Sequence, residues 1–290
     1  MSTGFETDQV LYHAGHEFRV RSLPGLDGQP PLVCIGGAFQ NIDSWTQTAD
    51  WFQPERALLL VDLPGMGDSP LLSNEFDIEF LCESLDNCLQ EFGVETASVL
   101  AASYGSLIAY RFAQLYPHRI AHLILVGIMA ELDQAQVAWA RQHIARIQSD
   151  PTYEFSDEIV SLLISEHMLK TRRGRVIARM LRKRLDALTG DNVRKYVSNT
   201  SRIIEHEPLN ISQPPLVPTL VFTGEHDHLT PPRAGRECAE TIPGAWFTTI
   251  RDADHLCHLQ QFDSCVNLVS KFLNDETLFG SKGCNEITRF

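Results

Sequence analysis

Residues 99–117, VLAASYGSLIAYRFAQLYP, decide how the rest of the sequence is interpreted. The first part of this stretch is an apolar run that predicts a buried strand, and the second part carries apolar side chains at helical spacing. Ser103 lies between them, with the small residues Ala101 and Gly105 two positions before and after it. A turn this tight would strain the serine backbone and project its hydroxyl above the sheet, beside the first N–H groups of a helix. The pattern predicts a nucleophilic serine; the alternative is a serine that merely ends a strand.

The composition is that of a globular chain, with 43% hydrophobic and 21% charged residues among 290. Asp and Glu outnumber Lys and Arg by 37 to 24, and the resulting net charge of −13 argues against nucleic acid as a partner. Seven scattered cysteines without a Cys-x-x-Cys pair are typical of reduced thiols rather than of a disulfide framework or zinc site. The polar start predicts no signal peptide, and no apolar run is long enough to cross a bilayer. We expect a soluble, cytoplasmic protein.

Short apolar runs alternate with helical patterns along most of the chain. This alternation predicts an α/β protein with a mostly parallel sheet and helices on both faces. The expected strands are residues 8–13, 16–22, 31–37, 57–65, 97–103, 122–127, 219–224 and 245–250. The expected helices that pack on the sheet are residues 77–92, 104–116 and 263–274.

The long segment between the expected strands 122–127 and 219–224 has no convincing strand. Its patterns predict four helices, over residues 131–149, 156–170, 174–189 and 191–206. Helices inserted there would cover the edge at which the parallel strands end, where ligands bind in open α/β folds. We expect a core of residues 1–130 and 214–279, a helical cap over 131–213, and a flexible tail over the polar residues 280–290.

Two further residues complete the chemistry that a serine nucleophile needs. A serine hydroxyl is activated by a base, and the base is oriented by a carboxylate. Asp227, in GEHDHLTPP, follows the end of the strand 219–224 by three residues. His255, in RDADHLCHL, lies between the next strand and the last helix. The order serine, acid, histidine, each after a strand, predicts a catalytic triad of Ser103, Asp227 and His255.

This set of motifs resembles the α/β-hydrolase fold superfamily of serine hydrolases and acyltransferases. VDLPGMGDS is also similar to the superfamily's Asp-x-Pro-Gly-x-Gly-x-Ser turn, so the resemblance covers nearly the whole chain. It implies an oxyanion hole formed by the backbone N–H groups of Tyr104 and Ala38, the latter in IGGAFQN after a strand. A plain glycine turn is the alternative for that loop. Because the nucleophile is serine rather than aspartate, the resemblance disfavours haloalkane and epoxide chemistry.

The sequence departs from the family pattern at three places. Ala101 stands where glycine is usual in the elbow, and IGGAF lacks the histidine that often precedes the oxyanion loop. Asp254 replaces the small glycine commonly found before the histidine, which leaves the conformation of that loop open. Together with Asp252, it could tune His255 electrostatically.

His226 and His228 flank Asp227 and suggest a zinc site at first sight. Adjacent ligands on one loop make a poor tetrahedral set, so we expect no metal and no other cofactor. His258 follows His255 by three residues and is expected to pack or to face solvent.

Residues 170–195 break the acidic balance, with ten Lys/Arg against two Asp. Arg172, Arg175, Arg179 and Arg182 recur at helical spacing on one face, while an apolar face would roof an acyl pocket. This apolar face consists of Val176, Ile177, Met180, Leu181, Leu185 and Leu188. One interpretation is a solvated helix balanced by the acidic body. The other is a docking face for acyl carrier protein, coenzyme A phosphates or an anionic membrane surface.

The Ala-Ser-x-Gly elbow, the GGA loop and the basic cap also resemble bacterial 3-hydroxyacyl-ACP acyltransferases of rhamnolipid and polyhydroxyalkanoate precursor synthesis. This resemblance implies acyl transfer or thioester hydrolysis on a medium-chain (3-hydroxy)acyl carrier, through an acyl-Ser103 intermediate. A generic carboxylesterase or lipase-like hydrolase is the alternative. A second alternative, of another class, is a non-catalytic ligand-binding protein of the same fold.

Overall fold

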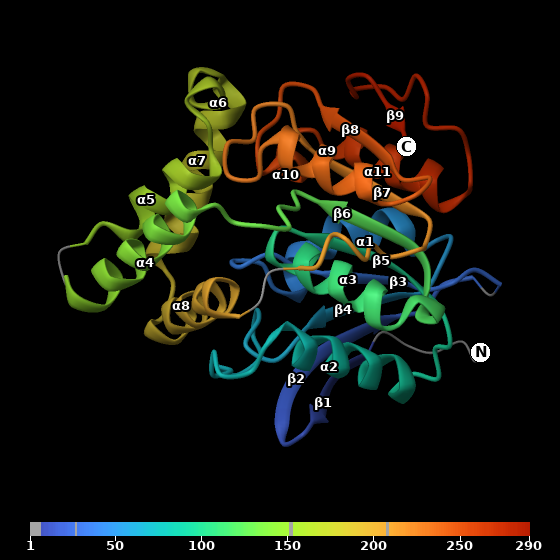
Figure 1. The fold of residues 1–290 in the computed structure, drawn as a ribbon, viewed down its shortest axis with the longest axis horizontal. Helices are drawn as coiled ribbons and strands as arrows, with labels where there is room; N and C mark the ends of the chain where they lie inside the picture. The colour runs from blue at the N-terminus through green and yellow to red at the C-terminus, as the bar shows by residue number, and fades with distance from the viewer. Residues whose placement is uncertain (1–6, 27, 151–152, 207–208) are drawn as a thin grey trace.

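The computed structural model describes residues 7–26, 28–150, 153–206 and 209–290. The expectation of no signal peptide rests on the polar start of the sequence, and residues 1–6 of that start lie outside the described residues. Figure 1 shows a central sheet with helices on both sides and a group of helices gathered at one end of it.

The described strands form one sheet in the order β1-β2-β4-β3-β5-β6-β7-β8-β9. The six neighbours from β4 to β8 run parallel, whereas β1, β2 and β9 pair antiparallel at the two ends. The fold class predicted from the sequence is confirmed. The strands are β1 (Thr7–His13), β2 (His16–Leu23), β3 (Leu32–Ile35), β4 (Leu58–Asp62), β5 (Ala97–Ala102), β6 (Ile120–Val126), β7 (Thr219–Gly224), β8 (Trp246–Ile250) and β9 (Thr288–Arg289).

The parallel strands β3, β4, β5 and β7 are buried along their whole length, which is why they are nearly continuous apolar runs rather than alternating ones. In β3, Val33 and Ile35 join the hydrophobic cluster on one face, and Leu32 and Cys34 join the cluster on the other. Helices α2 (Ile78–Glu91), α3 (Tyr104–Leu115) and α9 (Pro232–Thr241) pack on the first face, and α1 (Thr46–Phe52) and α11 (Phe262–Leu273) on the second. Short helical turns η1 (Ile42–Trp45), η2 (Pro117–Arg119) and α10 (Cys257–Gln260) connect them.

The helices at the end of the sheet carry a hydrophobic cluster of their own, which includes Ile159, Ile177 and Tyr196. They are α4 (Gln134–Ser149), α5 (Phe155–Leu163), α6 (Glu166–Lys170), α7 (Arg172–Asp186) and α8 (Gly190–Glu205), and we refer to these five helices as the cap. The sequence predicted one helix over 156–170, but two form. The break lies at Ser165, whose backbone is extended and whose hydroxyl accepts from the Met168 N–H, so that it begins α6 as a cap.

Helix α8 is fastened directly to the core. Arg202, with no exposed surface, donates to backbone carbonyl oxygens of the segment that follows β4 and to the Tyr104 hydroxyl. Lys195 and Asn199 donate to two further carbonyl oxygens of that segment, those of Gly67 and Gly65. These bonds fix α8 as a wall beside the carboxyl ends of the strands.

Residues 280–290, expected to be a flexible tail, instead pack on the sheet. The backbone of Cys284 forms an isolated antiparallel β-bridge with that of Ile250, and β9 pairs with the start of β8, where Arg289 lies opposite Trp246. Within the tail, Cys284 and Ile287 are buried. The tail covers the open edge of β8, which would otherwise leave backbone hydrogen-bonding groups unpaired.

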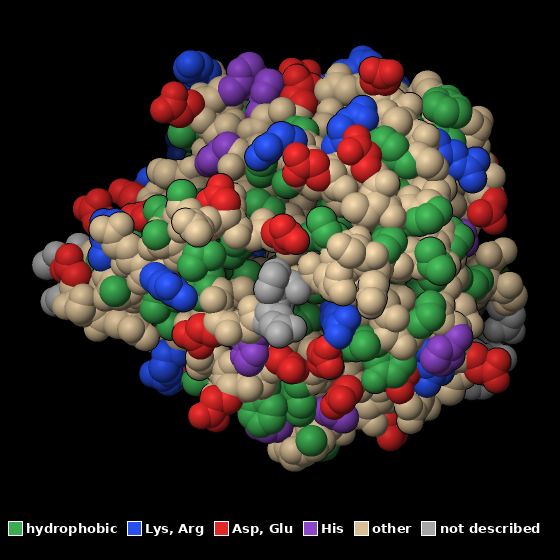
Figure 2. Space-filling model, viewed as in Figure 1, with side chains coloured by type: hydrophobic (Ala, Val, Ile, Leu, Met, Phe, Trp, Pro, Cys, Tyr) green, Lys and Arg blue, Asp and Glu red, His purple; other side chains and the backbone are tan. Residues whose placement is uncertain are grey.

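Charged side chains of both signs are interspersed over the face in Figure 2. Among the described residues, no helix combines the length and the apolar character that crossing a membrane would require.

Candidate active site

Ser103 lies in the turn between β5 and α3, with a left-handed backbone (φ 51°) that is strained for a residue other than glycine. Its N–H donates to the Val126 carbonyl of the neighbouring strand at 2.8 Å. A Cβ on Gly105 would lie 2.6 Å from the Gly36 carbonyl oxygen, so only glycine fits there. Ala101 is fully buried within β5, and its methyl group is accommodated in the core. The elbow therefore needs glycine at one of the two flanking positions only.

The three residues of the predicted triad come together at the carboxyl ends of β5, β7 and β8. His255 Nε2 lies 3.0 Å from Ser103 Oγ, and His255 Nδ1 lies 2.9 Å from Asp227 Oδ2. The acid and the histidine are 3% and 9% exposed, whereas the serine is half-buried. With the proton on Nδ1, the other ring nitrogen faces the serine hydroxyl as an acceptor.

Asp227 is held by more than the histidine. Its Oδ2 accepts from the hydroxyls of Thr223 (2.5 Å) and Thr230 (2.7 Å), and its Oδ1 accepts from the N–H groups of Leu229 and Thr230. Burial raises the pKa of this carboxyl, but the charge of His255 and these hydrogen bonds outweigh it and leave the pKa below its ordinary value. The carboxylate is therefore charged and fixed in direction.

The electrostatics of His255 run in the opposite sense. Burial lowers the pKa of the imidazole, but the charge of Asp227, its hydrogen bond and the charge of Asp254 outweigh this, and the pKa is raised above its ordinary value. Because the protonated form of His255 is stabilised in this way, the neutral imidazole is a stronger base.

The loop after β3 passes close to the serine. A Cβ on Gly37 would lie 3.2 Å from the Ser103 Cβ, so a side chain there would press on the nucleophile. The Gly37 N–H donates to Gln40 Oε1 at 2.7 Å, and Gln40 Nε2 lies 3.3 Å from His258 Nε2. His258, expected only to pack or face solvent, thus braces this loop. The next N–H along the loop is that of the half-buried Ala38.

Tyr104 provides the N–H at the first position of α3, where helical N–H groups have no acceptor within the helix. The positive end of the helix dipole reinforces this position for an anionic oxygen. The Tyr104 hydroxyl accepts from Arg202 at 2.9 Å, which ties the ring to the wall formed by α8.

The Asp-x-Pro-Gly-x-Gly-x-Ser turn is structural. The buried Asp62 carboxylate accepts from the Asp68 N–H at 2.9 Å, and its desolvation raises its pKa to about 7. Gly67 has φ +48°, and a Cβ there would overlap the Asp62 carboxyl group. This turn carries the carbonyl oxygens to which α8 is attached.

Asp254 has a role that sequence reasoning missed. This fully buried carboxylate accepts from the Ser165 N–H of the cap (2.9 Å), from the Leu256 N–H (3.1 Å) and from Gln260 Nε2 (2.7 Å). It therefore connects the start of α6 to the loop that carries the histidine. The only sequence signal was its departure from the usual glycine.

The four arginines predicted as a docking face all lie on α7 with exposed side chains. Arg175 donates to the Lys170 carbonyl at 2.7 Å, and Arg182 pairs with Asp157. The apolar residues of α7 do not form one pocket roof: Ile177 and Leu185 are buried in the cap, but two others are exposed. These are Val176 (46%) and Met180 (67%), which lie among the arginines. The expectation of a roof is wrong at these two positions because they face away from the cap interior.

Two depressions on the surface lie away from the triad. One of about 530 Å³ is lined by Arg146, Tyr153, Glu158 and neighbouring residues of α4 and α5. The other, of about 310 Å³, is lined by Phe76, Phe80 and acidic residues near the start of α2. Neither contains a residue of the triad.

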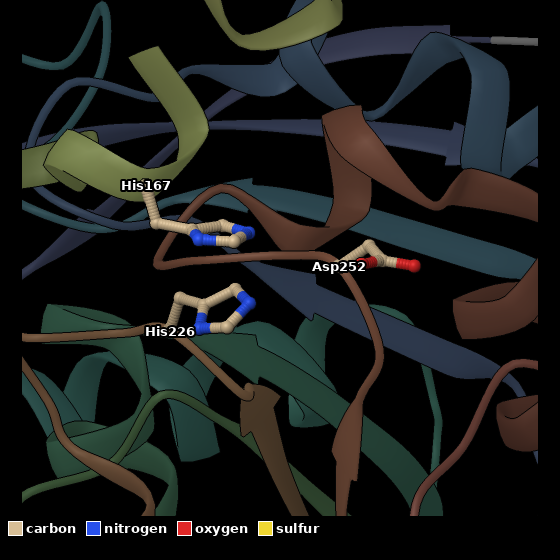
Figure 3. A group of neighbouring side chains, drawn as sticks. All are labelled: His167, His226 and Asp252. Carbon is tan, nitrogen blue, oxygen red and sulfur yellow. The ribbon is translucent and has the colours of Figure 1, made fainter. Parts of the chain in front are cut away.

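His226 and His228 do not converge on a common point with a third ligand; His228 contacts the Ser161 carbonyl at 3.0 Å. Instead, His226 lies beside His167 of α6 and Asp252 of the loop after β8. Figure 3 shows the two rings facing each other, with the aspartate beside them.

Comparison with known proteins agrees with this architecture. The 2-hydroxy-6-oxononadienedioate/2-hydroxy-6-oxononatrienedioate hydrolase of Klebsiella pneumoniae is 24% identical over 89% of this chain and 92% of its own. The (R)-3-hydroxydecanoyl-ACP:CoA transacylase of Pseudomonas aeruginosa is 21% identical over 88% of this chain and 84% of its own. Two further curated relatives are longer, and the chain spans 40% and 65% of their lengths.

Among solved structures, the enol-lactonase from Burkholderia xenovorans superposes with a TM-score of 0.80 at 21% identity, covering 92% of this chain and all of the other. The family model described as alpha/beta hydrolase fold matches residues 30–262, which include Ser103, Asp227 and His255. Hydrolases and acyltransferases are both among the relatives. The chain belongs to the alpha/beta hydrolase fold family.

Proposed function

We propose that the protein catalyses serine-dependent acyl transfer or hydrolysis on an ester or thioester, through an acyl-Ser103 intermediate. The observation that carries this proposal is the continuous hydrogen-bonded chain from Ser103 Oγ through His255 to Asp227, with distances of 3.0 and 2.9 Å. A serine on a strained turn with its hydroxyl bonded to a charge-supported imidazole is the arrangement that nucleophilic catalysis requires.

In the first half-reaction, Ser103 Oγ attacks the acyl carbonyl carbon while its proton moves to His255 Nε2. The negative charge on the carbonyl oxygen would be stabilised by the N–H groups of Tyr104 and Ala38. The imidazolium then gives its proton to the leaving alcohol or thiol. In the second half-reaction, water or an acceptor alcohol or thiol gives its proton to His255 Nε2 and attacks the acyl carbonyl carbon. The imidazolium then returns the proton to Ser103 Oγ as the bond between the acyl group and the serine breaks, which restores the free enzyme.

A fluorophosphonate probe tests the nucleophile. The wild-type protein should be labelled at one site, and Ser103→Ala should not be labelled, since an activated serine reacts without a cognate substrate. Ser106→Ala, which changes a buried serine one turn away, is the matched control and should be labelled. Folded wild-type protein that takes up no label would favour the alternative of a ligand-binding protein without catalytic activity.

We further propose that the acyl group is medium-chain, of the (3-hydroxy)acyl type, and delivered by an acyl carrier protein or coenzyme A. Two observations support this substrate class. The first observation is that one relative is an (R)-3-hydroxydecanoyl-ACP:CoA transacylase. The second observation is the exposed face of α7, where Arg172, Arg175 and Arg179 lie next to the exposed side chains of Val176 and Met180. Cations around apolar groups suit a carrier that presents phosphates or acidic residues. All seven cysteines are free, in keeping with a cytoplasmic setting.

The docking hypothesis is tested by reversing Arg175 and Arg179 to Glu. Exposed charges contribute about 0.2–1 kcal/mol each, so replacing two attractions by repulsions should raise KM for a carrier-bound substrate roughly tenfold. KM for a small neutral ester should stay unchanged. The matched control reverses Arg233 and Lys282, two exposed cations outside the cap. Equal effects of both double variants on the carrier substrate would contradict docking on α7.

Intact mass after brief exposure to a medium-chain 3-hydroxyacyl-ACP separates the remaining candidates. An acyl adduct on the wild type, absent from Ser103→Ala, would support both the intermediate and the carrier. Turnover of simple esters without any adduct or carrier release would favour a generic carboxylesterase.

A further inference from the structure

His167, His226 and Asp252 come from three segments that are far apart in the sequence. His167 lies on α6 of the cap, His226 directly precedes the triad acid, and Asp252 lies three residues before the triad histidine. One ligand-type atom of each lies within 4.8 Å of the others (Figure 3). The ring centroids of the two histidines are 3.9 Å apart.

The backbone around each residue is fixed, so this proximity is built into the fold. The Ser165 N–H, two residues before His167, donates to the buried Asp254 at 2.9 Å. The His226 N–H donates to the Ala253 carbonyl at 2.9 Å, which joins the acid loop to the histidine loop. Asp252 has a left-handed backbone (φ 49°), and its N–H donates to Glu225 Oε2 at 3.2 Å.

The donor set selects a class of ligand. Two neutral imidazoles and one carboxylate suit Zn²⁺ and neighbouring transition ions, whereas Mg²⁺ and Ca²⁺ prefer oxygen ligands throughout. A tetrahedral zinc site with bonds of about 2.0–2.1 Å needs ligand atoms ~3.3 Å apart, so ligand atoms that lie within 4.8 Å of one another must approach by at most about 1.5 Å. His167 and Asp252 are exposed and can make this approach. Glu225 Oε1, 3.4 Å from His226 Nε2, or water is available for a fourth position.

We propose that His167, His226 and Asp252 form a binding site for a transition-metal ion of the Zn²⁺ class, which joins the cap to the two loops that carry the acid and the base. The site lies outside the Ser103–His255–Asp227 hydrogen-bond chain and supplies no group to it. Its occupation would hold α6 against the core, since the three ligands meet only when the cap is seated.

The full-length protein, freed of metal with a chelator that is then removed, is titrated with Co²⁺ and with Zn²⁺. Co²⁺ is followed by its visible absorption, which is intense in tetrahedral sites, and Zn²⁺ by calorimetry. We expect one saturable site per chain. His167→Ala should weaken the affinity by more than the roughly 10–100-fold that loss of an outer-shell partner costs. The seven cysteines, all buried, should not compete in the folded protein.

The control variant is His118→Ala, an exposed histidine in η2, which directly precedes β6 and so lies where this parallel strand begins rather than where the strands end. It should bind both metals as the wild type does. Because His226→Ala could disturb the loop of Asp227, its folding is checked by circular dichroism, and His167→Ala, on the cap surface, is the decisive variant. Unchanged affinity in His167→Ala, or no saturable binding by the wild type, would overturn the proposal.

Amide hydrogen exchange gives a second readout that is independent of catalysis. Saturating Zn²⁺ should slow exchange in α6, residues Glu166–Lys170, at least about tenfold in the wild type, because a ligand that binds the seated cap opposes its opening. The slowing should disappear in His167→Ala. If Zn²⁺ slows exchange in α6 equally in the wild type and in His167→Ala, or in neither protein, the proposed site is overturned.

Discussion

Replacing Asp254 by asparagine tests whether this carboxylate holds the cap to the histidine loop. The change keeps the size and shape of the side chain and removes its charge. It also replaces one acceptor oxygen by an NH₂ donor. If the remaining oxygen keeps its bonds to the Leu256 N–H and to Gln260, the new NH₂ group faces the Ser165 N–H, which then loses its acceptor.

The magnitude follows from the hydrogen bonds involved. A hydrogen bond to a charged group contributes about 1.5–3 kcal/mol, and a buried donor left unsatisfied costs a similar amount. Because Ser165 begins α6, we expect the local closing equilibrium of this helix to weaken by about 1.5–3 kcal/mol. At 1.4 kcal/mol per factor of ten, this is a roughly 10- to 100-fold increase in cap opening.

Amide hydrogen exchange of α6, compared with α3 as an internal reference, measures this effect directly. In Asp254→Asn, exchange over residues Glu166–Lys170 should accelerate by that factor, while exchange in α3 changes less. Asp50→Asn, an exposed aspartate on α1, is the control and should leave both helices unchanged. If α6 keeps its protection while unfolding by urea shows a lower global stability, Asp254 supports the core alone and the reasoning is refuted.

Three further predictions concern the triad and the elbow. In metal-free buffer, the rate of fluorophosphonate labelling should rise with pH through a midpoint above 6.5, because the raised pKa of His255 keeps the base protonated and inactive at lower pH. Asp227→Asn should shift this midpoint down. An unchanged midpoint would mean that a group other than His255 controls the labelling rate. Thr230→Val removes a hydrogen bond to the buried carboxylate and should lower the free energy of unfolding by about 1.5–3 kcal/mol in urea; no loss would mean that the bond is replaced by another. Gly105→Ala places a methyl group against backbone carbonyl oxygens and should destabilise by about 3 kcal/mol or prevent folding, whereas Gly190→Ala, with open space around it, should be nearly neutral; equal urea midpoints would contradict the steric argument.

The parts of the fold and site that the sequence predicted are those specified by local pattern. The buried strands are continuous apolar runs, and the residues of the expected triad each follow a strand within a few positions. Because parallel strands end at one edge, residues placed after them are brought together whatever the detailed packing. This is why Ser103, Asp227 and His255 could be selected before any contact was known.

The features that were missed depend on contacts between distant segments. Ser165 and Asp254 are 89 positions apart, and neither residue alone predicts the bond between them. The polar composition of 280–290 suggested a loose tail, but the buried side chains of Cys284 and Ile287 and one short strand hold it on the sheet. The proximity of His167 and His226 likewise could not be predicted, because the two residues are far apart in the sequence. The sequence pattern pointed only to His226 and His228, which flank Asp227.

The attachment of α8 bears on how parts of this protein could be exchanged with those of a relative. The side chains of α8 end on carbonyl oxygens of Gly65, Gly67, Leu72, Ser73 and Phe76, which belong to the core by sequence. A chimera cut where the cap enters and leaves the chain would keep these oxygens but replace the donors that satisfy them. The segment from β4 to α2 should therefore be transplanted together with the cap. The natural boundary for recombination follows hydrogen-bond partnership rather than position in the chain.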